Sequence, residues 1–251
     1  MVCNSKVLEG KVAIITGCNR GIGAALLASF AAQGATVIAA ARRNSAEFEQ
    51  RIAMLAHDFN CAIKPIFFDI ADESAVKESL RSVLAEVPRI DILVNNAGIS
   101  HGGLLSMTPL SRVREVFQVN YFGPLAVTQV VSRKMMRQRS GVIVNVSSVA
   151  GLDPKPGNCA YGASKAALAY FTGVLAKELA EYNIRVNAVA PGLVSTEMAD
   201  AMERNAREQM VASSAMRRLG DPSEIADAVL YLCSGNASFV SGQVMRVDGG
   251  M

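Results

Sequence analysis

The chain has 251 residues, of which 51% are hydrophobic and 19% charged, and its formal net charge is +3. This length allows a large buried core and fits a single domain over residues 1–251, and so small a net charge gives no reason to expect nucleic acid binding. Two histidines and five scattered cysteines without a C-x-x-C pair argue against a metal site, and the apolar runs are too short to cross a bilayer. The unpaired cysteines, with a start that lacks a signal-peptide apolar segment, predict a reducing compartment such as the cytoplasm or the mitochondrial matrix.

Apolar runs without strict alternation predict buried strands. They lie near residues 11–16, 36–40, 62–68, 90–95, 142–146, 185–190 and 243–247. Helical patterns fill the intervals near residues 24–33, 45–58, 72–87, 109–138 and 161–182, and Pro222 begins a further helix. This alternation predicts a parallel sheet that binds ligands beyond the carboxyl ends of its strands. The long polar and methionine-rich excursion at about 193–218 is expected to form a substrate lid over that edge.

The first strand runs into a glycine-rich turn, Thr16-Gly-Cys-Asn-Arg-Gly-Ile-Gly23, which leads into a helix. At such a turn the free backbone N–H groups and the helix dipole favour a phosphate. The spacing G-x-x-x-G-x-G differs from the commoner dinucleotide-binding pattern. The glycines therefore predict an anion site, with plain turn chemistry as the alternative.

The residues after the second strand bear on the type of cofactor. In a dinucleotide-binding fold, an acidic residue at this place binds the ribose hydroxyls of NAD. Here Ala41 is followed by Arg42 and Arg43, so nothing repels a 2′-phosphate and two guanidinium groups can neutralise it. Arg20 in the glycine turn is a candidate for a third. We therefore expect NADPH as the cofactor; the alternative is that the arginines are ordinary solvated loop charges.

A possible acid/base pair occurs at Tyr161-Gly-Ala-Ser-Lys165. Helical spacing puts the phenol and the ammonium on one face, one turn apart, and a nearby cation lowers the pKa of a phenol. Ser148 lies thirteen residues upstream, at the end of a predicted buried strand, and can bring a hydroxyl to the same place. The three side chains therefore predict a site that acts on a carbonyl oxygen. A bland surface pair on the helix is the alternative.

Pro124 lies inside the predicted helix at 109–138. Proline lacks an N–H group, so the carbonyl of Asn120, four residues earlier, loses its helical partner. That carbonyl is a candidate for holding a water molecule. The alternative is a kink that serves packing alone.

In this order, the motifs resemble the short-chain dehydrogenase/reductase family along nearly the whole chain. The matching segments are Thr16–Gly23, Asn95–Gly98, Asn120, Ser148, Tyr161–Lys165, Pro191–Gly192, Thr196 and Val247–Gly250. The resemblance implies an α/β, doubly wound (Rossmann) fold with a seven-stranded parallel sheet and helices on both faces. It also implies an enzyme in which a hydride passes from a nicotinamide to a carbonyl carbon.

The same resemblance implies roles for individual residues. Tyr161 is expected to be the acid/base, and Lys165 to lower its pKa and hold the nicotinamide ribose. Ser148 is expected to steady the substrate carbonyl, and Asn120 to hold the water of a proton relay. The expected cofactor-binding residues are Gly17, Asn19, Arg20, Gly21, Ile22, Gly23, Arg42, Arg43, Asp69, Ile70, Asn96, Ala97, Gly98, Tyr161, Lys165, Pro191, Gly192, Val194 and Thr196.

Within the family, the chain is most similar to the 3-oxoacyl-[acyl-carrier-protein] reductases. The similarity rests on the length, on Asn96–Ile99, Gly103–Leu105 and Arg139, and on the ending Gly249–Met251. It implies reduction of a 3-oxoacyl thioester in fatty acid synthesis. Two other functions stay open. One is a broad-specificity carbonyl reductase, or an alcohol, steroid or sugar dehydrogenase of the same family; the other is a non-enzymatic member that acts as a cofactor sensor or assembly subunit.

Two expectations concern partners. A basic group precedes the strand that leads to Ser148, and it is made of Arg133, Lys134, Arg137 and Arg139. It is a candidate docking site for an acidic acyl carrier protein, although Tyr182 stands where the resemblance implies a second basic residue; the alternative is that these cations only complement the helix dipole. The helix after Lys165 is apolar on more faces than one sheet contact can cover, which predicts an interface. The family resemblance implies a homotetramer that uses this helix and the helix at 127–136.

Overall fold

Seven parallel strands form one sheet in the order β3-β2-β1-β4-β5-β6-β7. The computed structural model describes residues 6–200 and 202–251, so Cys3 lies outside the described residues. The strands are β1 (Val12–Thr16), β2 (Thr36–Ala41), β3 (Ile63–Phe67), β4 (Ile92–Asn95), β5 (Gly141–Val146), β6 (Ile184–Pro191) and β7 (Val244–Val247). The strand order reverses between β1 and β4, which confirms the predicted doubly wound, seven-stranded parallel sheet.

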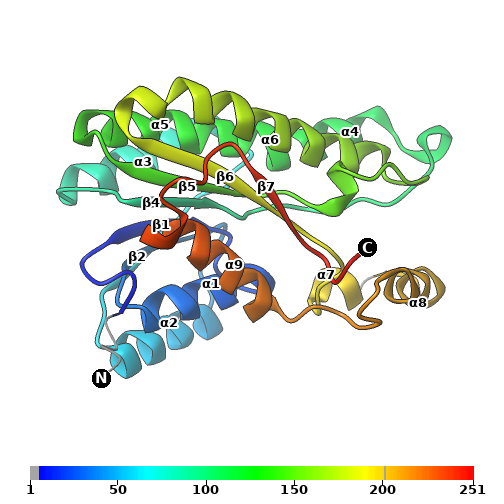
Figure 1. Cartoon of the computed structure of the whole chain (residues 1–251), viewed down its shortest axis with the longest axis horizontal. Helices are drawn as coiled ribbons and strands as arrows, with labels where there is room; N and C mark the ends of the chain where they lie inside the picture. Colours follow the sequence, from blue (N-terminus) through cyan, green and yellow to red (C-terminus); the bar gives the residue numbers. More distant parts are fainter. Residues whose placement is uncertain (1–5, 201) are drawn as a thin grey trace.

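Helices cover both faces of this sheet (Figure 1). One face carries α1 (Gly21–Ala32), α2 (Ala46–Phe59) and α9 (Pro222–Cys233). The other carries α3 (Glu73–Glu86), α4 (Leu110–Phe117), α5 (Gly123–Gln138) and α6 (Cys159–Glu178). The helices on each face enclose a separate hydrophobic core against the sheet.

The strand β1 shows why its sequence is apolar without alternation. Ala13 and Ile15 lie in the core that contains Leu26 of α1, while Ile14 lies in the other core with Leu80 of α3. Successive strand residues point to opposite faces, and here both faces are covered by helices. Every position of this strand therefore needs an apolar or hydrogen-bonded side chain.

Three of the differences between the predicted and the observed element boundaries change the description of the fold. α1 begins at Gly21 rather than at residue 24, so the last glycines of the turn form its first turn. α6 ends at Glu178, and a separate 3-10 turn, Ala180–Tyr182, follows it. The predicted helix at 109–138 is two α-helices joined by a π-helical turn, η2 (Gln118–Phe122).

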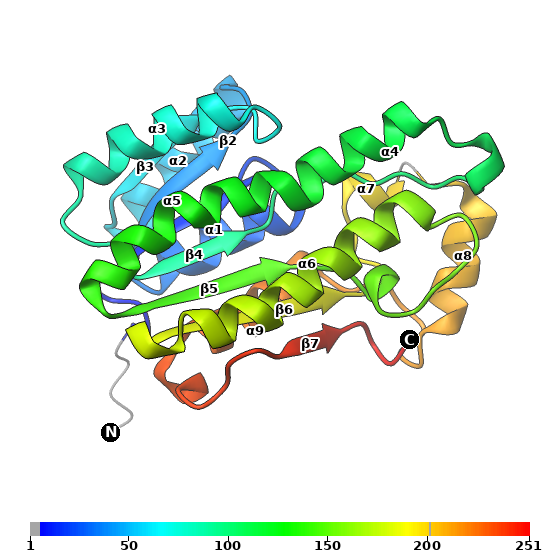
Figure 2. The same ribbon diagram turned by 90° about the horizontal axis from the view of Figure 1, so that it is seen from above.

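The excursion between β6 and α9 contains two short helices, α7 (Glu197–Asp200) and α8 (Arg204–Ser213). Figure 2 shows both helices beyond the arrowheads of the central strands, near the C-terminal end of the chain. The predicted lid at 193–218 occupies this position, apart from residue 201, which the structure does not describe. Among the described helices, none is long and apolar enough to cross a membrane.

Candidate active site

The predicted site residues come from several elements, and most of them meet at the carboxyl edge of the sheet. The glycine turn follows β1, Asn96–Gly98 follow β4, and Ser148 follows β5. Tyr161 and Lys165 lie in the first turns of α6, which begins at that same edge (Figure 2). The strand ends thus gather residues that are far apart in the sequence.

The glycine turn has a backbone that larger residues do not fit. Gly17 and Gly21 have φ values of 74° and 52°, in the left-handed region. A Cβ on Gly23 would lie 1.8 Å from the carbonyl oxygen of Gly17, so only glycine allows α1 to begin this close to β1. No side chain caps the start of α1 and its first turn holds no acidic residue. Its backbone N–H groups are therefore available to an anion, and the cradle fits the pyrophosphate of a dinucleotide.

Thr16, which the predicted site did not include, anchors this turn. Its Oγ1 accepts hydrogen bonds from the backbone N–H groups of Asn96 (3.0 Å) and Ala97 (3.1 Å). The Asn96 side chain donates in return to the carbonyls of Thr16 (2.9 Å) and Gly17 (3.1 Å). Asn96 therefore holds the glycine turn in place from the neighbouring strand. The sequence did contain a signal for this role of Thr16, since it places a hydroxyl at the end of a buried strand.

The three predicted arginines have different surroundings. Arg42 and Arg43 are exposed directly after β2, next to the buried Ala41, as a phosphate-binding role requires. Arg20 instead forms an ion pair with Glu197 of α7, and both side chains are largely exposed. In this structure, the guanidinium of Arg20 thus connects the glycine turn to the lid.

Residues on either side of the turn complete the expected cofactor surface. The carboxylate of Asp69 accepts a hydrogen bond from the N–H of Ala71 (2.9 Å), which fixes the bend after β3. Ile70 is buried against Gly123, where a Cβ would lie 2.7 Å from its Cγ1. Asn19 is exposed and its carbonyl accepts from Arg51, while Ile22 packs against the core.

The start of the lid lies against the glycine turn. Gly192, after the buried Pro191, donates its N–H to the carbonyl of Val247 (3.0 Å), and Val194 forms a bridge with Gly220. The Cγ2 of Thr196 lies 3.1 Å from the place where Gly21 would carry a Cβ. The predicted lid and the glycine turn therefore lie next to each other.

Four polar side chains that the sequence predicts to be catalytic lie close together. The ammonium of Lys165 lies 5.9 Å from the ring centroid of Tyr161 and donates to the carbonyl of Val146 (2.7 Å). Ser148 is buried, and its hydroxyl lowers the pKa of the phenol through a hydrogen bond. A Cβ on Gly98 would lie 3.3 Å from Asn120 Oδ1 and 3.4 Å from Lys165 Nζ, so this glycine leaves room for both.

The pKa of Tyr161 is opposite to the sequence-based expectation. Desolvation raises the pKa of the phenol above its ordinary value, and this outweighs the lowering by Ser148. Burial also lowers the pKa of Lys165 to about 8, because the ammonium has lost water. In the protein alone the phenol's pKa is therefore not lowered, and the effect of Lys165 on it stays a prediction; the ammonium here donates to the carbonyl of Val146.

A π-helical turn lies just before Pro124, where the sequence predicts an Asn120 carbonyl without its helical partner. The N–H of Gly123 donates to the carbonyl of Gln118, five residues earlier, just before the proline interrupts the ladder. The buried Asn120 side chain accepts from the N–H of Ile99 (2.9 Å) and donates to its carbonyl (2.9 Å) and to Ser164 Oγ (3.0 Å). Asn120 thus ties this turn to the loop after β4. A water on its carbonyl stays a prediction.

The basic group lies away from these residues. Arg139 precedes β5 and Ser148 follows it, so the length of a strand, on the order of 20 Å, separates them. The guanidinium of Arg139 donates to the carbonyl of Glu181 (2.7 Å) and lies over the ring of Tyr182. Lys134 donates to the carbonyls that end α3. Within one chain, these contacts indicate that Arg139 and Lys134 stabilise the fold.

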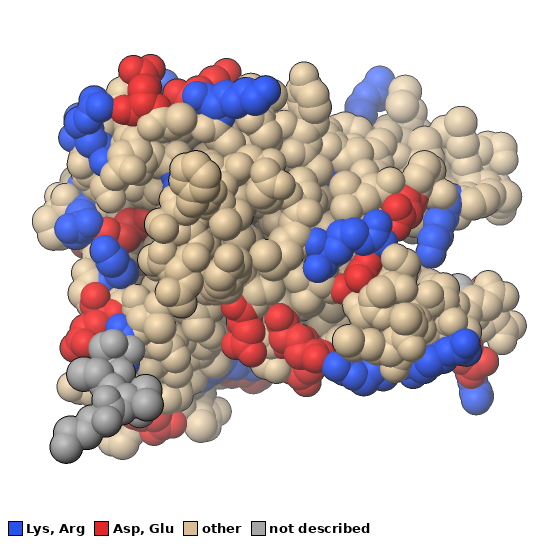
Figure 3. Space-filling view, in the orientation of Figure 1, with Lys and Arg blue, Asp and Glu red and all other residues tan. Residues whose placement is uncertain are grey.

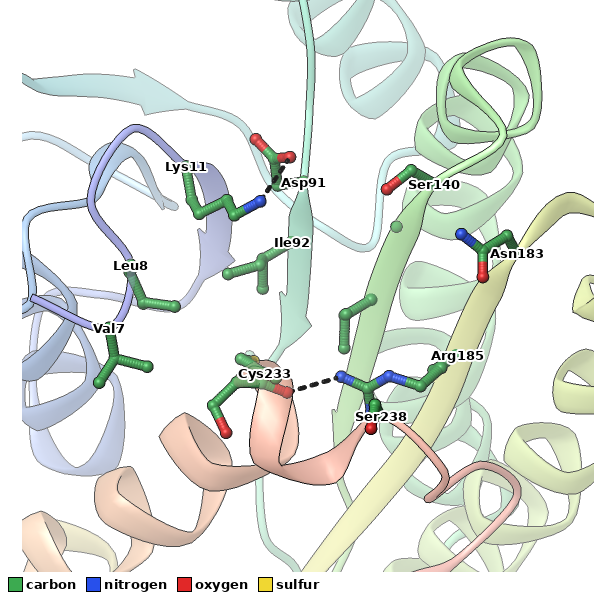
Figure 4. Close-up of a pocket in the computed structure, with 14 residues that line it drawn as sticks. Val7, Leu8, Lys11, Asp91, Ile92, Ser140, Asn183, Arg185, Cys233 and Ser238 are labelled. Atoms are coloured by element: carbon green, nitrogen blue, oxygen red, sulfur yellow. Dashed lines mark hydrogen bonds and ion pairs between the residues drawn. The ribbon is translucent and has the colours of Figure 1, made fainter.

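A hollow of about 350 Å³ also lies at the amino edge of the sheet, opposite the site (Figure 4). Lys11 pairs there with Asp91, and Arg185 reaches across to the carbonyl of Ser234, at the end of α9. The charged groups of this hollow are thus largely occupied by one another or by backbone carbonyls, and none of the predicted site residues lines it.

Comparison with known proteins gives a consistent result. Residues 17–251 match the family model described as Enoyl-(Acyl carrier protein) reductase. The 3-oxoacyl-[acyl-carrier-protein] reductase FabG of Thermotoga maritima is 43% identical over 244 residues, covering 97% of this chain and 98% of its own, and that of Escherichia coli K12 is 36% identical over 243 residues, with the same coverage. The crystal structure of 3-oxoacyl-[acyl-carrier protein] reductase from Brucella melitensis superposes with a TM-score of 0.88 at 34% identity, covering 98% of this chain and 92% of that one. A 7α-hydroxysteroid dehydrogenase complexed with NADH and 7-oxo glycochenodeoxycholic acid superposes with a TM-score of 0.91 at 32% identity, covering 98% and 96%.

Proposed function

Because the chain belongs to the short-chain dehydrogenase/reductase family and is an oxidoreductase acting on carbonyl or alcohol groups, we propose that it reduces the 3-oxo group of an acyl thioester with NADPH. The observation that carries this proposal is the meeting of Ser148, Tyr161, Lys165 and Asn120 beside a glycine turn that fits a pyrophosphate. The substrate class is supported by the relatives, which are named 3-oxoacyl-[acyl-carrier-protein] reductases.

The residues of this site would have separate roles in such a reaction. The glycine turn and Arg42 would bind the phosphates of the cofactor, which when bound supplies a hydride. Ser148 would hold the carbonyl oxygen of the substrate. Tyr161 would give its proton to that oxygen, since a phenol with its ordinary pKa near ~10 is already protonated at neutral pH. Lys165 would exchange the Val146 carbonyl for the ribose hydroxyls and bring its positive charge to the proton donor.

A carrier protein and further subunits belong to the proposal as well. A carrier docked on Arg139 stands a strand's length from Ser148 of the same chain, so we propose that it serves the site of another subunit in a homotetramer. The four described cysteines are free thiols, which supports a reducing compartment such as the cytoplasm.

A second function follows from one specific observation. The steroid dehydrogenase has the same fold to a TM-score of 0.91, so a larger alicyclic ketone is a competing substrate class. An activity panel separates the two: NADPH consumption with acetoacetyl-CoA, with the same acyl group on a carrier protein, and with steroid, quinone and sugar ketones. We expect the thioesters to give the highest kcat/KM, with the carrier-linked form favoured at low salt. Preference for a steroid or another ketone would contradict the thioester assignment. If no carbonyl compound is reduced, the remaining candidate is the non-enzymatic cofactor sensor.

A further inference from the structure

Arg246, on the edge strand β7, joins three parts of the molecule that surround the substrate side of the site. Its guanidinium pairs with Asp153 (Nη2 to Oδ2, 2.7 Å) and Asp248 (Nε to Oδ2, 2.8 Å). The same Nη2 donates to the backbone carbonyl of Met251 (2.6 Å). The planar, many-donor guanidinium can hold these groups in one geometry, which an ammonium cannot.

Asp153 belongs to the turn that directly follows Ser148. Its N–H donates to the carbonyl of Val149 (2.8 Å), which closes the turn. The turn is wedged against α6, since a Cβ on Gly151 would lie 2.6 Å from the nitrogen of Ala166. A displacement of Asp153 is therefore passed to Ser148 and to the helix that carries Tyr161.

The other two contacts of Arg246, with Asp248 and Met251, hold the C-terminal tail. The tail in turn contacts the end of the predicted lid. The carbonyl of Gly249 accepts hydrogen bonds from the hydroxyl of Ser214 (2.9 Å) and from the N–H of Met216 (3.0 Å), just after α8. A cavity of about 300 Å³ lies between these parts, and both Arg246 and Met216 line it. One guanidinium thus links the turn after Ser148 to the end of the lid.

We propose that Arg246 is a positioning residue that fixes the distance between the Ser148 turn and the lid, and so sets the affinity for the acyl substrate. This inference rests on the proposed reduction of an acyl thioester. An isolated surface ion pair contributes little, and the Asp153 side chain is 44% exposed, but the Asp248 side chain is only 8% exposed and three acceptors share one donor group. The pKa of Asp153 is held below its usual range, mainly by the hydrogen bond from Arg246.

Kinetics of Arg246→Met test this role. We expect KM for acetoacetyl-CoA to rise roughly three- to tenfold while kcat and the Kd for NADPH stay nearly unchanged, because contacting groups couple on this scale. Arg246→Lys should recover part of the loss. Asp153→Asn should raise KM in the same direction, and the double variant should be no worse than the worse single one. Lys77→Met is the matched control, since Lys77 pairs with Glu73 on α3, which packs against β1, β2 and β4, whereas Arg246 lies on the edge strand β7.

Amide hydrogen exchange tests the geometry without turnover. In Arg246→Met, residues 149–153 and 214–216 should exchange faster together, while the glycine turn keeps its wild-type rate. Unchanged exchange in these segments, or a fall in kcat with unchanged KM, overturns the proposal. Should Arg246→Met fail to fold, Asp153→Asn carries the same test, because it leaves the tail contacts in place. If the wild-type protein reduces no thioester, the proposed function fails, and exchange alone decides whether Arg246 positions the two segments.

Discussion

At the scale of single residues, burial favours the neutral form of both titrating groups of the site. It raises the pKa of the Tyr161 phenol and lowers that of the Lys165 ammonium to about 8, so both side chains are driven toward their neutral forms. A neutral phenol is a proton donor at physiological pH, whereas a charged lysine is retained there only at a cost to stability.

Removing the phenol oxygen tests the proton donor. We expect Tyr161→Phe to abolish turnover and to leave NADPH binding largely intact, because the phenyl ring keeps the packing and only the proton is lost. Cofactor affinity and rate should be measured in parallel. A variant that keeps more than about a tenth of the wild-type rate would show that another group donates the proton.

The lowered pKa of Lys165 predicts a pH-dependent stability. Between the folded pKa of about 8 and the ordinary 10.5, the unfolded chain binds more protons than the folded one, so this residue's contribution to stability rises with pH. The advantage of Lys165→Met over the wild type in the free energy of unfolding should shrink by about 3 kcal/mol between pH 7 and pH 10.5. Chemical denaturation of both proteins across this range measures it. A constant difference would mean that the buried lysine titrates as it does in water.

Cofactor choice is tested at Arg42. A hydrogen bond to a charged group contributes roughly 1.5–3 kcal/mol, so Arg42→Ala should weaken NADPH binding about 10- to 100-fold and leave NADH nearly unchanged. Titration with each cofactor gives the two affinities, and Arg81→Ala, at an exposed position of α3, is the control. Equal losses for NADPH and NADH would assign Arg42 a structural role.

At the scale of elements, the sequence predicts the strands but not the π-helical turn or the ion pair between Arg20 and Glu197. Apolar runs located every strand, because both faces of the sheet are buried and the pattern is unambiguous. The π-helical turn at Gln118–Phe122 was missed, since Pro124 shows that the ladder breaks but not how the N–H groups re-pair. The pairing of Arg20 with Glu197 was also beyond reach, because it depends on how the lid folds back over the glycine turn.

The π-helical turn allows a close contact that a substitution can test. A Cβ on Gly123 would lie 2.7 Å from Ile70 Cγ1 and 2.8 Å from its carbonyl oxygen. We expect Gly123→Ala to destabilise the protein by about 1–3 kcal/mol and to weaken cofactor binding, because Ile70 must shift. Thermal unfolding and NADPH titration measure both effects, with Ser82→Ala in α3 as a helical control. If stability falls while cofactor binding is unchanged, Ile70 does not line the cofactor.

At the scale of the whole molecule, two aromatic side chains are largely exposed. The exposed fractions are 79% for Tyr170 on α6 and 104% for Phe239 beside the edge strand β7. Figure 3 shows a broad area without Lys, Arg, Asp or Glu in the middle of the face on which β7 lies. An unpaired strand edge next to such an area is typical of an interface between subunits.

The proposed homotetramer predicts a defined response to charge at this surface. Light scattering of the wild type should give four times the mass of the chain, and Tyr170→Asp with Phe239→Asp should give a smaller species. Met54→Asp is the control, since Met54 is 57% exposed on α2, on the other side of the sheet. A wild-type monomer at micromolar concentration would contradict the assembly.

The position of β1 has a consequence for how the protein is made. Its partner β4 arrives late in synthesis: the N–H of Val12 bonds to Asp91, 79 residues further along the chain. Until then, the flank of β1 that pairs with β4 has no backbone partner, and Ile14 and Ile15 lack half of their core. Parallel sheets with such distant partners fold slowly and expose aggregation-prone edges meanwhile. Refolding yield should therefore fall as protein concentration rises.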